Sequence, residues 1–288
     1  MEKTDITAFR KELKNMVSQW TPKEKMPVSV VADKQIYNYL PIRIYRKDDS
    51  SIALPVLIFL HGGGWVRGDL DTHDDLCRRL VSQGDFMMVS VHYRLAPEYL
   101  FPYAMEDAFA TLKWVLEHAA EIKADKGNIA VCGDSSGGNL ALALVQQAKE
   151  NDIALKGLVV AYPPLSYDFD TPSYHKFAEG YGLTTALMKE LWNTYLGDTL
   201  NAENHFASVI RNDFVGYPTT LIIASDEDPL RDDGSQLFNK MVAASVAVTY
   251  SFYPGTRHAF LLRTAIEKAA ITAQQEIINF LKNKVFVS

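Results

Sequence analysis

The sequence predicts an α/β fold in which a mostly parallel central sheet is flanked by helices on both faces. From Val56 onward, short apolar runs alternate with helical patterns, which is typical of such a sheet. The 288 residues, 48% of them hydrophobic, are enough for one large domain with insertions. The expected strands are Val56–Leu60, Phe86–Val91, Asn128–Cys132, Gly157–Ala161, Thr219–Ala224 and Val248–Tyr253.

Two helices of the main domain are expected from apolar residues that recur three and four positions apart. This spacing places the residues of each set on one helical face, so we interpret both faces as part of the core. The first set is Met105, Ala108, Phe109, Leu112, Val115 and Leu116, and the second, near the C-terminus, is Ile266, Ala270, Ala273, Ile277 and Phe280.

Two segments interrupt the alternation of strands and helices. Residues 1–50 are expected to form N-terminal cap helices and lead-in strands. Residues 51–288 are expected to form the main domain, with a cap insertion at about 164–210 that is rich in Tyr, Phe, Pro and Gly. Because long insertions in α/β domains are more often functional than not, we expect a lid over a site, with a packed peripheral decoration as the alternative. The N-terminal helix carries an apolar face of Phe9, Leu13, Met16, Val17 and Trp20.

Composition excludes several classes of partner and cofactor. The net charge of −6 disfavours nucleic acid, which needs a concentrated basic surface. No apolar run reaches the roughly 18 residues of a membrane helix, and Met1 to Lys14 is charged without a signal-like apolar stretch, so we expect a cytoplasmic protein with no membrane partner. Cys77 and Cys132 fit no disulfide framework or zinc spacing.

The strongest motif is Gly133–Gly138, with the sequence GDSSGG. It follows the expected strand Asn128–Cys132 directly and precedes a run compatible with a helix, Asn139–Lys149. This is the strand–turn–helix context of the G-x-S-x-G nucleophile elbow, whose glycines permit a sharp turn. The spacing makes Ser135 the nucleophile, and the backbone N–H of Ser136 a donor to the oxyanion.

A serine hydroxyl needs a base within hydrogen-bond reach, and the base is usually a histidine. When the nucleophile lies at an elbow between a strand and a helix, the acid follows the nucleophile along the chain and the histidine follows the acid. His175, His205 and His258 all follow Ser135, but the first two fall in the expected cap. His258 comes after the last expected strand, at the edge where the elbow also lies, so we predict that it is the base.

The acid that orients this histidine is expected at a strand end between Ser135 and His258. The strand Thr219–Ala224 runs directly into a stretch of carboxylates, and spacing alone leaves Asp226 and Asp228 open. Asp232 and Asp233 lie where a helix would begin, which favours capping for them.

A glycine run follows the first strand of the main domain, at His61–Trp65. It matches the HGGG-type motif that supplies further backbone N–H groups to an oxyanion. It lacks the Lys-Ser/Thr ending of a phosphate-binding loop. His61 precedes the nucleophile, so we interpret it as a structural residue of this loop. Asp69, His73 and Asp74 are explained by a turn and a helix start, and we expect no metal.

With these residues in place, the chain resembles the hormone-sensitive lipase family of α/β-hydrolases, in its bacterial short-chain carboxylesterase branch. The resemblance runs from about residue 55 to the end and rests on several separated motifs in the family's order. They are His61–Trp65, Tyr93–Glu98, Gly133–Gly138, Asp228–Asp232 and His258–Phe260.

The resemblance implies an α/β-hydrolase fold with a helical cap and a cofactor-free Ser-His-Asp triad. The family's catalytic aspartate directly precedes Pro-Leu, which selects Asp228 and leaves Asp226 second. The family's oxyanion donors correspond to Gly63 and Gly64, with Ser136. The chain departs from the pattern at Ser136, where the family usually has alanine, and at Ala259, where it usually has glycine.

We therefore expect a serine carboxylesterase that hydrolyses small, short-chain acyl esters. An amidase or lactonase with the same triad, or a non-catalytic small-molecule receptor on the same fold, are the alternatives. A homodimer is a further expectation from the family. Aromatic residues are expected to shape the substrate pocket, namely Trp65, Tyr162, Phe169, Tyr181 and Trp192.

Overall fold

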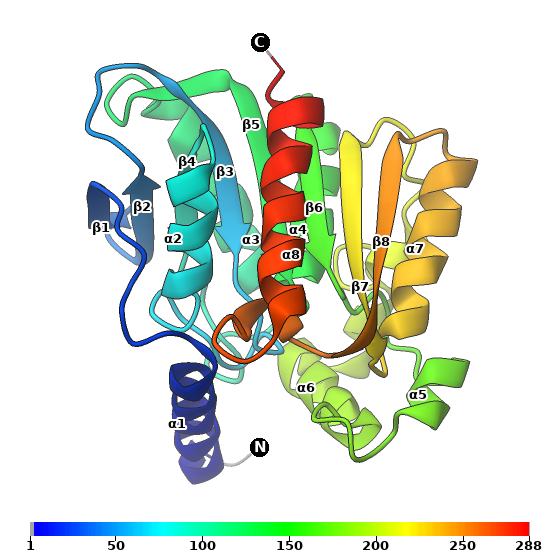
Figure 1. The fold of residues 1–288 in the computed structure, drawn as a ribbon. Coiled ribbons are helices and arrows are strands. Elements are labelled where there is room, and N and C mark those ends of the chain that lie inside the picture. The colour runs from blue at the N-terminus through cyan, green and yellow to red at the C-terminus, as the bar shows by residue number, and fades with distance from the viewer. Residues whose placement is uncertain (1–2, 288) are drawn as a thin grey trace.

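The computed structural model describes residues 3–287, and its centre is one eight-stranded sheet with the order β1-β2-β4-β3-β5-β6-β7-β8 (Figure 1). The first three strands in this order pair antiparallel, and the others are parallel. The strands are β1 (Val30–Ile36), β2 (Leu40–Arg46), β3 (Leu54–Leu60), β4 (Met87–Val91), β5 (Ala124–Asp134), β6 (Gly157–Ala161), β7 (Thr219–Glu227) and β8 (Val248–Arg257).

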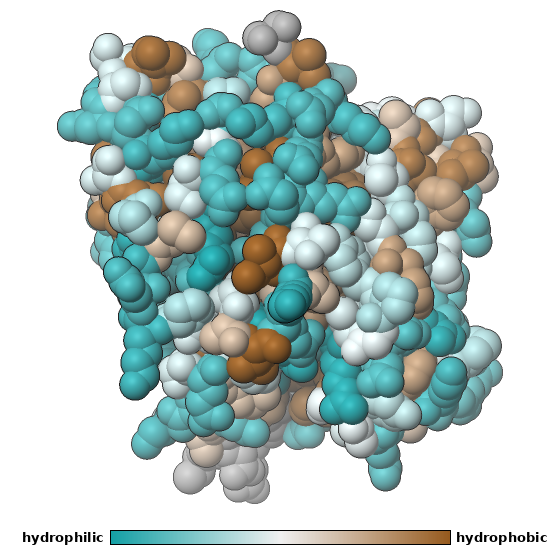
Figure 2. Space-filling model, in the orientation of Figure 1, coloured by the Kyte–Doolittle hydropathy of each residue, from teal (hydrophilic) through white to brown (hydrophobic). Residues whose placement is uncertain are grey.

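Helices cover both faces of this sheet, and each face has its own apolar cluster. One face is covered by α2 (Asp74–Gln83) and α8 (Lys268–Phe280), the two helices in front in Figure 1. The other face is covered by α3 (Tyr103–Glu117), α4 (Ser136–Glu150) and α7 (Arg231–Ala243). Figure 2 shows the α2 and α8 face as mostly hydrophilic, as expected for a helical layer with its apolar side turned inward. A short π-helix, η4 (Leu281–Val285), continues α8.

The remaining helices belong to the cap, and those labelled α1, α5 and α6 in Figure 1 lie beyond the edge where the parallel strands end. They are α1 (Lys3–Trp20) from the N-terminus and, between β6 and β7, α5 (Pro172–Lys176), α6 (Thr185–Leu196), η1 (Thr199–Glu203) and η2 (Val209–Arg211). A last short helix, η3 (Phe260–Leu262), follows β8. The loops after β3, β5, β7 and β8 end at this edge, so the cap lies next to the expected catalytic residues.

The structure changes three of the expected boundaries. Residue 50 does not separate two units, because β1 and β2 belong to the main sheet, where Ile42 of β2 pairs with Val91 of β4. The described part of the N-terminal segment holds one cap helix rather than several, while Met1 and Glu2 lie outside the described residues. Ile266 precedes α8 and is 60% exposed, because the chain still turns there through the Glu267 N–H to Arg263 carbonyl bond.

Among residues 3–287, no helix combines the length and the apolar character that crossing a membrane requires.

Candidate active site

Ser135 lies at the sharp turn between β5 and α4, with φ 51° and ψ −124°. This conformation is strained for a residue with a side chain, and strain of this kind is typical of a nucleophile elbow. The flanking glycines are required by close backbone contacts. A Cβ on Gly133 would lie 2.1 Å from the Gly137 carbonyl oxygen, and a Cβ on Gly137 would lie 2.0 Å from that of Leu60. The turn thus presents Ser135 at the edge of the sheet and at the N-terminus of α4.

His258 lies between Ser135 and Asp228 in a continuous hydrogen-bonded chain. Its Nε2 is 2.8 Å from Ser135 Oγ, and its Nδ1 is 2.8 Å from Asp228 Oδ2. The other two histidines that follow Ser135 lie elsewhere: His175 is exposed beside Asp170, and His205 contacts Glu150. The structure therefore brings together the three residues that the sequence proposed as a triad.

Asp228 is fully buried and its carboxylate is held by several donors. Ser225 Oγ donates to Oδ2 over 2.5 Å, and the Leu230 N–H donates to Oδ1 over 2.9 Å. Asp226, the alternative that spacing left open, instead accepts a hydrogen bond from the Gly255 N–H. Of these two aspartates, Asp228 is the one that contacts His258.

Asp232 and Asp233 lie in the first turn of α7, as their expected capping position requires. Asp232 also reaches the cap, since its Oδ2 accepts a hydrogen bond of 2.8 Å from the Ser173 N–H of α5. Asp233 is buried, and this burial, together with the nearby Asp228, raises its pKa well above the ordinary value. A second carboxyl group near the triad acid is thus shielded from water.

The glycine run after β3 forms a loop with left-handed backbone, with φ 129° at Gly63 and 68° at Gly64. The loop is tied to the elbow at its start, because the Gly62 N–H donates to Asp134 Oδ1 over 2.8 Å. His73 Nε2 lies 3.2 Å from the same oxygen. Burial by itself raises the pKa of Asp134, but His73 and the Gly62 N–H oppose this and hold the pKa below its ordinary value. Asp134 is therefore a buried anion that fixes the loop beside Ser135.

His61 is completely buried at the start of this loop. Its Nδ1 lies 2.9 Å from the Gly62 carbonyl oxygen, and its ring stacks on Tyr93 with centroids 4.3 Å apart. The Tyr93 hydroxyl donates to the His61 carbonyl oxygen over 2.7 Å. Burial lowers the pKa of His61 to about 3, so the ring is neutral at pH 7. These contacts agree with the structural role in the glycine loop that the sequence predicts for His61.

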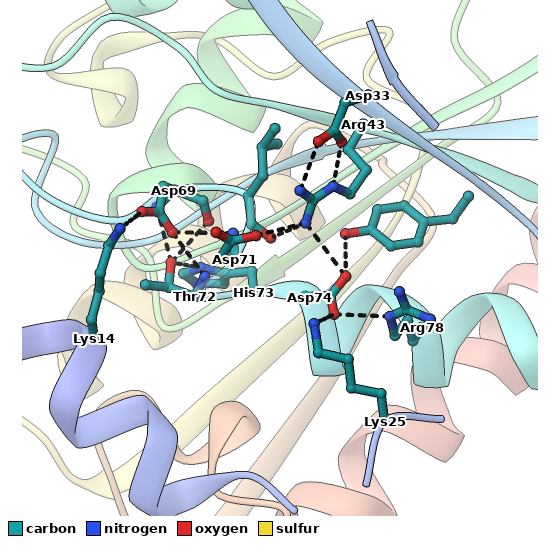
Figure 3. Close-up of polar contacts among 12 residues, drawn as sticks. Lys14, Lys25, Asp33, Arg43, Asp69, Asp71, Thr72, His73, Asp74 and Arg78 are labelled. Carbon is teal, nitrogen blue, oxygen red and sulfur yellow. Dashed lines mark hydrogen bonds and ion pairs between the residues drawn. The ribbon is translucent and has the colours of Figure 1, made fainter. Parts of the chain in front are cut away.

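The turn that follows the loop is held by ion pairs (Figure 3). Lys14 of α1 pairs with Asp69, and Arg43 of β2 pairs with Asp71. Asp74, at the start of α2, is bonded by four side chains, which are those of Lys25, Arg43, Tyr45 and Arg78. The carboxylates of Asp69 and Asp74 thus have cationic protein partners, and the turn connects α1, β2 and α2 to the glycine loop.

A cavity of about 100 Å³ opens beside Ser135 and His258. The glycine loop and the elbow form its polar side. Its apolar side comes from the cap, with Leu13, Met16 and Trp20 of α1 and Leu183, Leu187, Met188 and Leu191 in and before α6. Both segments that were expected to form a lid therefore contribute to its wall.

The aromatic residues expected around the pocket take different places. Trp65 lines the cavity. Tyr162 packs edge-on against the His258 ring at 4.9 Å, and Trp192 lies behind Trp65 at 4.5 Å. Tyr181 contacts Phe177 and Arg257 instead. Phe169 packs among Tyr167 and Tyr174, so aliphatic side chains form most of the wall where aromatic ones were expected.

Sequence reasoning missed two arginines at this cavity, Arg67 and Arg263. Arg263 donates to the His258 carbonyl oxygen over 3.0 Å and pairs with Glu267, so it supports the histidine loop. Arg67 follows the glycine run by three residues, and this closeness in sequence is the signal that could have identified it.

The fold and the site define the class of protein, an α/β hydrolase with a serine at its nucleophile elbow. Residues 57–262 match the family described as alpha/beta hydrolase fold. The chain is 35% identical over 251 residues to carboxylic ester hydrolase LipN of Mycobacterium tuberculosis. The matched region covers 84% of this chain and 66% of that protein. It is 34% identical to ethyl acetate hydrolase of Pseudomonas putida, over 80% of this chain and 74% of that one.

Among solved structures, the thermophilic carboxylesterase EstE1 from a metagenomic library has a TM-score of 0.94 to this chain. The two are 32% identical, and the similarity covers 98% of each chain. The chain therefore belongs to the alpha/beta hydrolase fold family, in the hormone-sensitive-lipase-like group that the motifs indicated. The expected fold class and family are confirmed.

Proposed function

We propose that this protein is a serine carboxylesterase that hydrolyses short-chain acyl esters through an acyl-enzyme. The class is a carboxylic ester hydrolase, as relatives that cover most of the chain are named carboxylic ester hydrolase, carboxylesterase and ethyl acetate hydrolase. The observation that carries the mechanism is the hydrogen-bonded chain from Ser135 through His258 to Asp228.

In the first step, Ser135 Oγ attacks the ester carbonyl carbon while His258 Nε2 takes its proton. The resulting imidazolium is stabilised by Asp228 at Nδ1, and it then gives the proton to the leaving alkoxide as the C–O bond breaks. In the second step, His258 removes a proton from water, whose oxygen attacks the acyl-enzyme. Collapse of this intermediate releases the acid and returns the proton to Ser135.

The negative charge that develops on the carbonyl oxygen is assigned to the N–H groups of Gly63, Gly64 and Ser136. Within residues 6–287, whose backbone and side chains are both described, the N–H groups of Gly63 and Gly64 have no protein acceptor. The positive end of α4 adds to the stabilisation, because Ser136 is its first residue. Fixed donors of this kind contribute about 2.7–4 kcal/mol each to lowering the barrier.

The size of the cavity supports short acyl chains as substrates. A volume of about 100 Å³ beside Ser135, with an aliphatic wall, accommodates a small acyl group and is too small for a long one unless the cap moves. A relative named ethyl acetate hydrolase agrees with small esters.

Hydrolysis of p-nitrophenyl esters from acetate to palmitate tests this proposal, with Ser135→Ala as the decisive variant and Ser136→Ala beside it. We expect turnover of the short esters that Ser135→Ala abolishes, while Ser136→Ala keeps measurable turnover because its N–H remains. Turnover that survives Ser135→Ala would refute the assignment of the nucleophile.

The alternatives from the sequence become outcomes of the same experiment. Faster hydrolysis of a matched amide or lactone would favour an amidase or lactonase, and binding without turnover would favour a receptor. The expected homodimer and the expected cytoplasmic location stay predictions. Analytical ultracentrifugation tests the first, and cell fractionation tests the second.

A further inference from the structure

Arg67 places a cation in the wall of the cavity beside the candidate oxyanion donors. Its side chain runs along Gly63, since a Cβ on Gly63 would lie 3.2 Å from Arg67 Cγ. The Arg67 backbone also closes the glycine loop, with its N–H donating to the Gly63 carbonyl oxygen over 3.2 Å. The position of the guanidinium group is thus tied to the loop that holds the reacting ester.

Among residues 6–287, the part of the chain whose side chains the structure describes, the guanidinium group of Arg67 has no acidic partner. It makes no hydrogen bond to a protein acceptor there, and its Nε is buried without a partner. Burial lowers the pKa of Arg67 to about 10, and the charge of Glu12 opposes this shift. The guanidinium group stacks on the Phe9 ring, whose centroid lies 3.8 Å from Cζ.

The other arginine at the cavity, Arg263, has polar partners for its terminal nitrogens, although its Nε is also buried without one. Arg263 pairs with Glu267 over 2.8 Å, bonds the His258 carbonyl oxygen and lies over the Trp20 ring. Arg67 has the stacking contact but neither of the polar ones. Arg67 is partly exposed, but its Nε is shielded from water with no acceptor in place of the water, which is costly for a cation. The guanidinium group in this substrate cavity is therefore available to an anionic ligand.

We propose that Arg67 selects ester substrates that carry a free carboxylate in their acyl or alcohol part. The planar fork of a guanidinium group matches the two oxygens of a carboxylate, and such charge-assisted hydrogen bonds are strong in a desolvated site. This inference rests on the proposed esterase function and adds the substrate class to it. The competing explanation is that Arg67 only clamps α1 against the glycine loop through Phe9, and it predicts no dependence on substrate charge.

The first measurement compares charged and neutral esters of matched size in a pH-stat at pH 7.5. For the acyl part, monoethyl glutarate is compared with ethyl pentanoate. For the alcohol part, acetoxyacetate is compared with acetoxyacetamide. We expect kcat/KM to favour the anionic member of at least one pair, and the pair that responds identifies the side of the ester that carries the carboxylate.

The variants separate pairing from clamping. Arg67→Met keeps a long side chain against Phe9 without charge, and Arg67→Lys keeps a charge without the fork. Lys14→Met is the matched control, because it removes a nearby cation that α1 directs at Asp69, outside the cavity lining (Figure 3). We expect the anionic-to-neutral ratio of kcat/KM to fall about tenfold or more in Arg67→Met, less in Arg67→Lys, and to stay constant in Lys14→Met.

Calorimetric titration of the Ser135→Ala protein gives a readout that does not depend on turnover. Monoethyl glutarate or acetoxyacetate is expected to bind more tightly than its neutral partner, and adding Arg67→Met is expected to remove the difference. Equal ratios in the wild type and Arg67→Met, or equal binding in both backgrounds, would overturn the inference while leaving the esterase intact. Absence of turnover on every ester would instead refute the proposed function, and the binding result would still decide the role of Arg67. If Arg67→Met does not fold, Arg67→Lys and Arg67→Gln take its place in both measurements.

Discussion

Acidification is expected to destabilise the fold through His61, the buried ring at the start of the glycine loop. In the folded protein, burial lowers its pKa from 6.5 to about 3, while in the unfolded chain the ring titrates near its ordinary value. Between these two values the unfolded state binds one more proton than the folded state. A depressed histidine pKa therefore removes stability as pH falls below 6.5, and the loss stops near pH 3.

The size of this effect follows from the pKa difference. Each pH unit in the window changes the free energy of unfolding by about 1.4 kcal/mol, because one proton is taken up on unfolding. Lowering the pH from 7.5 to 4.5 is thus expected to cost about 2.7 kcal/mol through His61 alone. This is a large share of the stability of a typical domain.

Urea unfolding at pH 7.5, 6.5, 5.5 and 4.5 measures this loss in the wild type and in His61→Gln. The variant keeps a side-chain donor for the Gly62 carbonyl oxygen but cannot titrate. We expect its free energy of unfolding to depend less steeply on pH, whatever its absolute stability. Parallel profiles for the two proteins would refute the reasoning, because the remaining dependence would then come from other groups.

Three further substitutions test the site. Asp228→Asn is expected to lower kcat on a short p-nitrophenyl ester by up to about 10⁴-fold, because a neutral amide no longer stabilises the His258 imidazolium. Asp226→Asn is the control variant, and similar losses of kcat in both variants would contradict the choice of Asp228 as the acid. Gly64→Ala is expected to lower kcat about tenfold or more, because φ at this position is 68° and the new Cβ would lie 2.6 Å from Leu191 Cδ1, which displaces the N–H donor. An unchanged kcat would exclude Gly64 as an oxyanion donor. Ala259→Gly is expected to change the free energy of unfolding by less than about 1 kcal/mol. Glycine relieves the strain of the left-handed backbone at this position (φ 62°), but it also gives the unfolded chain more conformational freedom. Urea unfolding measures the change, and a larger loss of stability would show that the Ala259 side chain has a packing role.

Local patterns were sufficient for much of the fold. The strands of the main domain were predicted within a few residues because each is a short, buried apolar run bounded by turns. β5 and β8 extend further than expected, to Ala124 and Arg257, because pairing with β3 and β7 continues past a register shift in each case. Such pairing depends on the neighbouring strand, so it cannot be predicted from the strand's own sequence.

The sequence by itself determined the residues that come together at the edge of the sheet. Ser135 and His258 could be predicted because the elbow and the last strand impose their position along the chain, and Asp228 because the family motif names it. The tertiary structure decided what surrounds them. The aliphatic wall comes from α1 and α6, which meet only in the fold, and the unpaired state of Arg67 depends on which carboxylates lie near it in space. Backbone motifs act over a few residues, whereas the shape and charge of a cavity result from contacts between distant segments.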